Sequence, residues 1–205
     1  MERVFVRTYE APPVRRDEIL RYAGVRGESA ELTPLLSECL EEAKTALNYS
    51  VCYAEFPIAW KEDALDLGFA MTTSRDLQKN LAGCSSGLVF AATVGLGIDR
   101  LIARYARVSP TKALLFQAIG AERIESLCET FCREISEEQG EYLLHPRFSP
   151  GYGDLPLELQ KEIVAYLDGP KRIGLHLNQS LLLSPTKSVT ALVGREKREE
   201  VRNFV

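Results

Sequence analysis

Apolar residues recur at steps of three and four along much of the chain, which is the spacing of a helix that buries one face. The pattern predicts helices over 15–24, 31–49, 75–81, 97–108, 111–140 and 156–169. Residues that favour helix ends support these bounds, since Ser74 and Pro110 stand at predicted starts and Gly24 at a predicted end. Helices are therefore predicted along most of the sequence.

Runs of β-branched and aromatic residues between these helices predict strands. The runs cover 1–13, 50–60, 65–74, 87–95 and 172–194, the last holding two or three strands. A hairpin is one arrangement of 50–60 and 65–74. The run 87–95 is apolar at every residue but one, as expected of an interior strand buried on both faces. No repeat or low-complexity linker interrupts the chain, which predicts one α+β domain over residues 1–205.

Composition narrows the classes of partner. The chain is 45% hydrophobic and 26% charged with a net charge of −4, and no stretch approaches the roughly 20 apolar residues of a membrane helix. The negative charge disfavours nucleic acid. The first residues lack the apolar block of a secretion signal, which predicts a cytoplasmic protein. Neither a membrane nor a nucleic acid is expected as a partner.

The cysteines favour reduced thiols. Their positions are Cys39, Cys52, Cys84, Cys128 and Cys132. An odd number with no CxxC spacing, beside only two histidines, supports neither a disulfide framework nor a zinc site. Cys128 and Cys132 are four apart on a predicted helix, but neither histidine of the chain is close to them in sequence, and two cysteines alone do not define a metal site. We expect no metal site.

One glycine pattern invites a nucleotide-binding interpretation. In "VFAATVGLGIDR", residues 89–100, a buried strand runs through Gly95 and Gly97 into a helix. A dinucleotide-binding turn needs a third glycine where Arg100 stands, because helix and strand approach closely there. A methyltransferase of the Rossmann type needs an acidic residue before a run of three spaced glycines, whereas this stretch has Thr93 there and only Gly95 and Gly97. The chain also lacks GxxxxGK[ST] and HExxH, and we assign no catalytic residue.

The stretch "HPRFSPGYGDLP", residues 145–156, is rich in residues that fix a backbone or bind a ligand. Arg147 is able to hold a carboxylate through two hydrogen bonds, and Pro150 fixes the backbone before Gly151, where a ligand can approach the main chain. Tyr152 adds a ring face and a hydroxyl. This set suits a ligand with a carboxylate at one end and a cation or flat group near the other, such as an amino acid or S-adenosylmethionine. The alternative is an ordinary turn with a structural Arg–carboxylate pair.

The order of these residues adds a family resemblance. An Arg-x-x-x-Gly-Tyr stretch, then Pro156, a helix bearing Lys161 and "SPTKSV", resembles the activation domain of cobalamin-dependent methionine synthase, in a short stand-alone form. The resemblance covers mainly Ala121 to Gly194, with a weaker echo in "GCSSGLVFAATVGLGIDR". It implies an α+β domain with a mainly antiparallel sheet and packed helices.

The resemblance also implies roles for individual residues. Arg147 would hold the carboxylate of S-adenosylmethionine, while Pro150, Gly151 and Tyr152 would line the pocket, with Tyr152 facing the cobalamin. The family uses an acidic side chain on the long helix for the ammonium or ribose hydroxyls of the ligand. Glu125 and Glu129, one helical turn apart, are both candidates.

The function that follows is reactivation of a corrinoid cofactor. The module would bind S-adenosylmethionine and support reductive methylation of cob(II)alamin carried by a separate methionine synthase or methyltransferase component, with a flavodoxin or ferredoxin-type electron donor. Such a role predicts an exposed apolar or concave patch around Tyr152. Two alternatives stay open. One is a non-catalytic module that binds or assembles a corrinoid protein, favoured because "REKREEVRNFV" stands where the family continues into a tyrosine-containing loop; the other is an unrelated α+β protein with a chance motif.

Overall fold

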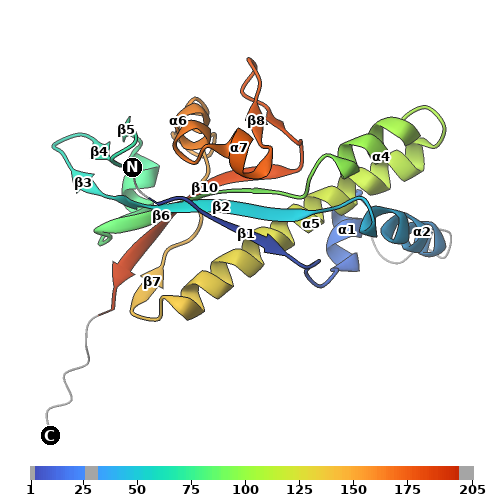
Figure 1. The fold of residues 1–205 in the computed structure, drawn as a ribbon, viewed down its shortest axis with the longest axis horizontal. Helices are drawn as coiled ribbons and strands as arrows, with labels where there is room; N and C mark the ends of the chain where they lie inside the picture. The colour runs from blue at the N-terminus through green and yellow to red at the C-terminus, as the bar shows by residue number, and fades with distance from the viewer. Residues whose placement is uncertain (1–2, 26–31, 199–205) are drawn as a thin grey trace, which may run out of the picture.

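A five-stranded antiparallel sheet forms the centre of the computed structural model, which describes residues 3–25 and 32–198 (Figure 1). Its strand order is β1-β2-β6-β10-β7, and every neighbouring pair is antiparallel. The strands are β1 (Phe5–Tyr9), β2 (Tyr49–Pro57), β6 (Ser86–Thr93), β7 (Tyr142–Leu144) and β10 (Ser188–Lys197). The sequence prediction of an α+β fold with a mainly antiparallel sheet is confirmed.

Strand β6 lies in the middle of the sheet, as its unbroken apolar run predicted. It pairs with β2 on one side and β10 on the other, and its residues after Ser86 are all buried. Phe90 points into the core on one face of the sheet, and Val89 points into the core on the other. This alternation gives the domain two cores that share one sheet.

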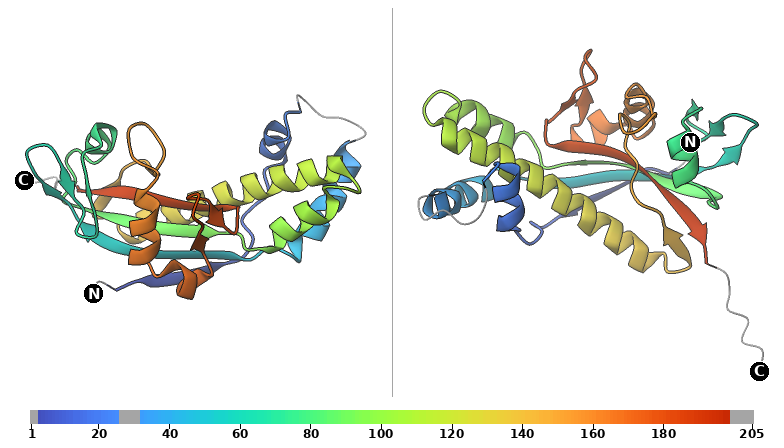
Figure 2. Two further views of the ribbon diagram at one scale, coloured as in Figure 1. Left: turned by 90° about the horizontal axis from the view of Figure 1, so that it is seen from above. Right: turned by 180° about the vertical axis from the view of Figure 1, so that it is seen from behind.

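Each face of the sheet is covered by its own group of helices (Figures 1 and 2). On one face lie α1 (Arg16–Tyr22), α2 (Leu32–Lys44), α4 (Gly97–Tyr105) and the long α5 (Pro110–Glu138). On the other lie α3 (Arg75–Asn80), α6 (Leu159–Tyr166) and α7 (Gly169–Ile173). Two small sheets accompany the second group. They are formed by β3 (Ala59–Trp60), β4 (Leu65–Asp66) and β5 (Met71–Thr72), and by β8 (His176–Leu177) and β9 (Leu183–Ser184).

The structure corrects several predicted boundaries. The run 65–74 is two short strands, because the chain turns at Gly68 with a positive φ of 77°. The helix predicted over 31–49 already ends at Lys44. The strand predicted over 50–60 begins one residue earlier than predicted, at Tyr49. Residue 31, the first of that predicted helix, lies outside the described residues.

Two short elements were not predicted. Gly169 and Pro170 were expected only to end a helix, but they also begin α7, since proline suits the first turn of a helix. Strand β7 lies at the edge of the sheet and is only three residues long, so it leaves little periodicity in the sequence.

The two glycines of the nucleotide-like pattern serve close packing. Gly95 adopts a φ of +81°, and a side chain there would overlap Asn48. A methyl group on Gly97 would overlap the carbonyl oxygen of Ala46. The turn from β6 into α4 therefore lies directly against the connection between α2 and β2, and the glycines are explained without a nucleotide.

Replacing Gly97 with alanine is expected to destabilise the fold by about 2 kcal/mol or more, because the added methyl group meets backbone atoms that cannot rotate away. Urea unfolding followed by circular dichroism measures this loss. Gly140→Ala is the matched control, since the nearest atom to a methyl group there is 3.8 Å away. Equal unfolding midpoints for the two variants would contradict this account of Gly97.

Candidate functional site

The loop after β7 is shaped by its proline and glycine residues. Phe148 exchanges two backbone hydrogen bonds of 2.8 Å with Leu192 of β10, which ties the start of the loop to the sheet. Pro150 is buried, and Gly151 follows with a φ of +89°, a conformation that favours glycine. The Gly151 N–H then donates to the carbonyl of Leu155 at 2.9 Å. The loop is thus a closed turn that presents Tyr152 at its tip.

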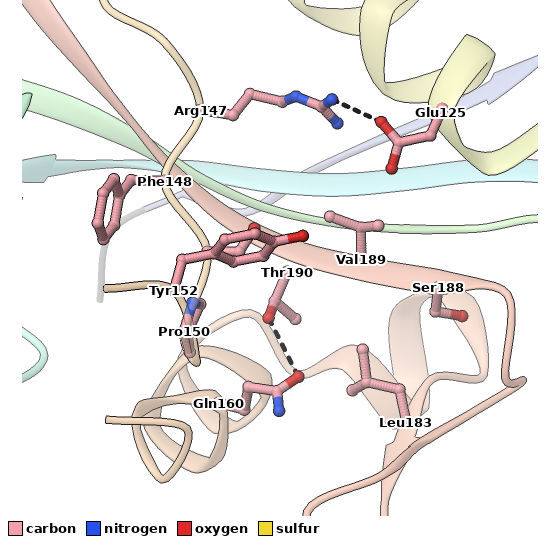
Figure 3. A pocket seen from close by; sticks show the side chains of 11 residues that line it. Glu125, Arg147, Phe148, Pro150, Tyr152, Gln160, Leu183, Ser188, Val189 and Thr190 are labelled. Carbon is pink, nitrogen blue, oxygen red and sulfur yellow. Dashed lines mark hydrogen bonds and ion pairs between the residues drawn. The ribbon is translucent and has the colours of Figure 1, made fainter. Parts of the chain in front are cut away.

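A cavity of about 450 Å³ opens between this loop, α5, α6 and the end of β10 (Figure 3). Its walls are formed by Glu125, Arg147, Phe148, Ser149, Pro150, Tyr152, Gln160, Leu183, Ser188, Val189 and Thr190. The volume is within the range of small-molecule sites, and the lining mixes apolar walls with a few polar groups, as such sites do.

An ion pair occupies one end of the cavity. The Arg147 guanidinium reaches from the loop toward α5, and its Nη2 donates to Glu125 Oε2 at 2.6 Å (Figure 3). The two side chains are 29% and 33% exposed, so solvent and ligands can reach both. Burial opposes the charge of Arg147, but the hydrogen bond to Glu125 and the charge interactions with Glu125 and the neighbouring cysteines together leave the pKa of Arg147 above its ordinary value. Arg147 therefore keeps its positive charge at neutral pH.

Tyr152 lies at the mouth of the cavity and is 69% exposed. Its ring stands between the ion pair and the polar residues at the opposite end (Figure 3). Leu157 lies beside the same turn, 3.2 Å from where a Gly151 side chain would begin, and it is also exposed. An exposed aromatic and aliphatic surface thus adjoins the cavity, as the sequence predicted.

The backbone of β10 supplies further polar groups. Leu192 directs its N–H and C=O to Phe148, on the side of the strand away from β6. Because backbone groups alternate along a strand, Thr190 directs its own N–H and C=O to the same side. No strand of the described chain pairs with β10 at that position. The edge at Thr190 therefore offers a donor and an acceptor beside the cavity that Thr190 lines.

The structure brings together four of the six residues named from the sequence. Glu125, Arg147, Pro150 and Tyr152 line the cavity. Gly151 shapes the turn but is not among the lining residues. Glu129 points to a different partner, Arg15 at the start of α1, with an Nη1 to Oε2 distance of 3.0 Å. Of the two glutamates that the sequence left as alternatives, Glu125 lines the cavity and Glu129 does not.

Several lining residues were missed. They are Phe148, Ser149, Gln160, Leu183, Ser188, Val189 and Thr190. Gln160 left a signal in the sequence, since it is a polar residue on the apolar face of α6 and is 6% exposed in the structure. Its amide donates to the carbonyl of Leu181 at 3.2 Å and its oxygen accepts from the Thr190 hydroxyl at 3.4 Å. The other residues carry no local signal of this kind.

All five cysteines are free thiols. Cys128 and Cys132 of α5 lie near Arg147 of the loop. Burial raises the pKa of Cys132 to about 11, so this thiol stays protonated at neutral pH. Within residues 3–25 and 32–198, no three histidine, cysteine or acidic side chains are arranged to hold a metal ion. In the same residues, no helix is both long and apolar enough to cross a membrane.

Comparison with known proteins reveals similarity at the level of fold. No protein-family model matches the chain, and no curated protein matches its sequence. Among solved structures, the crystal structure of the MetH reactivation domain bound to AdoHcy matches with a TM-score of 0.66 and 15% sequence identity. The match covers 97% of this chain and 80% of that one. The chain therefore has the fold of that domain, as the sequence resemblance predicted.

Proposed function

We propose that this chain binds S-adenosylmethionine in the cavity beside Tyr152 and supports reductive methylation of cob(II)alamin held by a separate corrinoid protein. The observation that carries the proposal is the Arg147–Glu125 ion pair at the end of a cavity of ligand size. The fold supports it, since a structure of that fold was solved with AdoHcy bound.

The ion pair matches the amino-acid end of the ligand. An α-amino acid carries a carboxylate and an ammonium group on one carbon, and Arg147 and Glu125 present the two complementary charges 2.6 Å apart. A ligand inserted between them exchanges one protein ion pair for two charge-assisted pairs, so no buried charge is left without a partner. This exchange favours a zwitterion over a simple anion.

The opposite end of the cavity suits a nucleoside. The free edge at Thr190 offers a neighbouring N–H and C=O, and Gln160 adds an amide. A purine ring presents donors and acceptors along one side and flat apolar faces, which suit such an edge and the ring of Tyr152. The electron-rich face of Tyr152 also favours a sulfonium cation nearby.

The chemistry requires little from the protein beyond positioning. One electron from a flavodoxin or ferredoxin-type donor reduces cob(II)alamin to cob(I)alamin. The cobalt electron pair of cob(I)alamin then attacks the sulfonium methyl carbon, the C–S bond breaks, and S-adenosylhomocysteine leaves with that bond's electrons. No proton is transferred, so the side chains need only bind the ligand and orient its methyl group toward the docked corrinoid.

Methyl transfer is tested with the purified chain, a corrinoid protein, a reductant and S-adenosylmethionine labelled on its methyl group. We expect label to appear on the corrinoid with the wild type, and much less label with Arg147→Ala when S-adenosylmethionine is below saturation. Docking of the corrinoid protein without transfer of label would instead support the alternative module, which binds or assembles a corrinoid protein. If the corrinoid protein neither docks nor receives label, both the methyl-transfer function and the alternative binding module are refuted.

A further inference from the structure

The loop that carries Arg147 and Tyr152 contacts helix α3 at two places. One lies before Arg147, at residues 145–146, and the other lies after Tyr152, at Asp154. At the N-terminus of α3, the Asp154 carboxylate accepts the N–H of Arg75 at 2.8 Å and that of Asp76 at 3.2 Å, as well as the Ser74 hydroxyl. These groups would otherwise lack partners, because the first turn of a helix leaves its N–H groups free. Asp154 therefore caps a helix that is far from it in sequence.

The other end of α3 holds the start of the loop. The Asn80 side chain donates to the Pro146 carbonyl at 3.1 Å, and the Asn80 carbonyl lies 2.6 Å from His145 Nδ1. The second ring nitrogen, Nε2, lies 2.9 Å from Glu196 Oε2 on β10. His145 thus connects α3 to the edge of the main sheet.

These contacts span residues 145–154, and the cavity-lining part of the loop lies between them. Gly153 fits directly against Asp76, because a side chain on Gly153 would begin 2.5 Å from the Asp76 carboxylate. Figure 2 shows α3 beside the loop in both views. Helix α3 makes no wall of the cavity itself, so its contribution is to hold the loop.

The two acceptors around His145 require a charged ring. A neutral imidazole has one N–H, whereas both its nitrogens here face acceptors, the Asn80 carbonyl and the Glu196 carboxylate. The Cys84 thiol also lies against the ring, with its sulfur 3.6 Å from Nδ1. Burial raises the pKa of Cys84 to about 11, so that thiol is neutral. Deprotonation of His145 therefore removes one of its two hydrogen bonds.

We propose that α3 braces the ligand-binding loop through Asp154 and His145, and that the His145 bridge makes affinity for S-adenosylmethionine depend on pH. Both residues are positioning residues, since neither lines the cavity. The ligand part of this inference rests on the proposed function; the brace rests on the contacts alone. A loop that loses one anchor is less ordered before binding, and the ligand must then supply the ordering free energy.

The direction of the pH effect follows from the pKa of His145. Its hydrogen bond to Asn80 and its pairing with Glu196 raise the pKa above 6.5, although burial opposes the charge. The bridge is therefore complete below pH 6.5 and is lost as the pH rises through the raised pKa. By linkage, ligand binding raises the pKa of His145 further, and each unit of that change corresponds to a tenfold change in affinity.

Calorimetric titration with S-adenosylmethionine between pH 6 and 8.5 tests the pH dependence. We expect the affinity of the wild type for S-adenosylmethionine to fall about threefold or more from pH 6 to 8.5. His145→Gln should bind more weakly at low pH, with an affinity that does not change with pH. Glu196→Gln keeps the ring but removes the carboxylate, so the fall should move to lower pH. NMR titration assigns the event, because the chain has only two histidines and His176 is exposed. A flat wild-type profile, or the same slope in His145→Gln, would overturn the pH dependence.

Asp154→Ala tests the other anchor, with an expected affinity loss of about fivefold at every pH, the size of a lost helix cap. Lys79→Ala is the control on the same helix, since Lys79 is exposed and forms its ion pair with Asp76 at the surface. Amide hydrogen exchange of residues 146–153 reports loop order without any ligand. If the wild type binds no S-adenosylmethionine at any pH, the proposed function fails. The brace by α3 is refuted separately if residues 146–153 are as well protected from hydrogen exchange in Asp154→Ala and His145→Gln as in the wild type.

Discussion

Replacing Arg147 with alanine is expected to weaken S-adenosylmethionine binding by about 2 kcal/mol or more, which is about 30-fold. Among the residues that the structure describes, Arg147 is the only cation that lines the cavity, so the change leaves two carboxylates, that of the ligand and that of Glu125, facing each other. The fold should be retained, because the Arg147 side chain is partly exposed and the loop is fastened by other residues. Isothermal titration calorimetry measures the affinity.

Two glutamate variants make this prediction specific. Glu125→Gln should weaken binding, since Glu125 lines the cavity, whereas Glu129→Gln should not, because Glu129 pairs with Arg15 elsewhere. The two residues share one helix and one chemistry, so they differ mainly in location. Equal affinity for the wild type and Arg147→Ala, or equal effects of the two glutamate variants, would contradict the site.

Breaking the buried pair of Glu122 and Arg123 is expected to cost about 3–5 kcal/mol of folding free energy. Glu122 is 0% and Arg123 is 2% exposed, with Arg123 Nε donating to Glu122 Oε2 at 2.6 Å. Arg123 also donates to the carbonyls of Pro12 and Pro13 at 2.5 and 2.7 Å, which holds the segment before α1 against α5. Arg123→Met leaves the buried Glu122 carboxylate with the Ser126 hydroxyl at 2.7 Å, the Arg15 backbone N–H at 3.2 Å and the more distant Arg15 Nε at 3.6 Å. Urea denaturation measures the loss.

The exposed pair of Glu18 and Arg21 is the control for that experiment. It joins the same types of side chain on the surface of α1, so Glu18→Gln should leave the urea unfolding midpoint nearly unchanged. The double variant Glu122→Gln with Arg123→Met should recover part of the loss, because no charge is then left unpaired. A cost for Arg123→Met as small as that for Glu18→Gln would show that the buried pair contributes little.

The sequence predicted the elements whose pattern is strong and local. The apolar run of β6 is unbroken because that strand pairs on both sides and is covered on both faces. The long helix α5 has a continuous apolar stripe and a proline in its first turn, and its bounds were predicted within two residues. The small sheet of β3, β4 and β5 was predicted only as parts of the longer runs 50–60 and 65–74, since strands of two residues carry too little periodicity to be told apart.

The candidate site was predicted only where its residues are close in sequence. The loop holds Arg147, Pro150 and Tyr152 within six positions, and their chemistry is readable there. Thr190 contributes backbone groups whose availability depends on β7 ending early along β10, which is a property of strand pairing. The choice between Glu125 and Glu129 depended on Arg15, which approaches from the other end of the chain. Both features depend on contacts between residues far apart in sequence, which the local pattern of residues does not reveal.

A crystal structure of the chain grown with S-adenosylhomocysteine tests the central claim most directly. We predict that the ligand lies in the cavity beside Tyr152, with its carboxylate on Arg147, its ammonium group on Glu125 and its base at the Thr190 edge. A cavity that stays empty at saturating ligand, with Arg147 and Glu125 still paired to each other, would contradict the account.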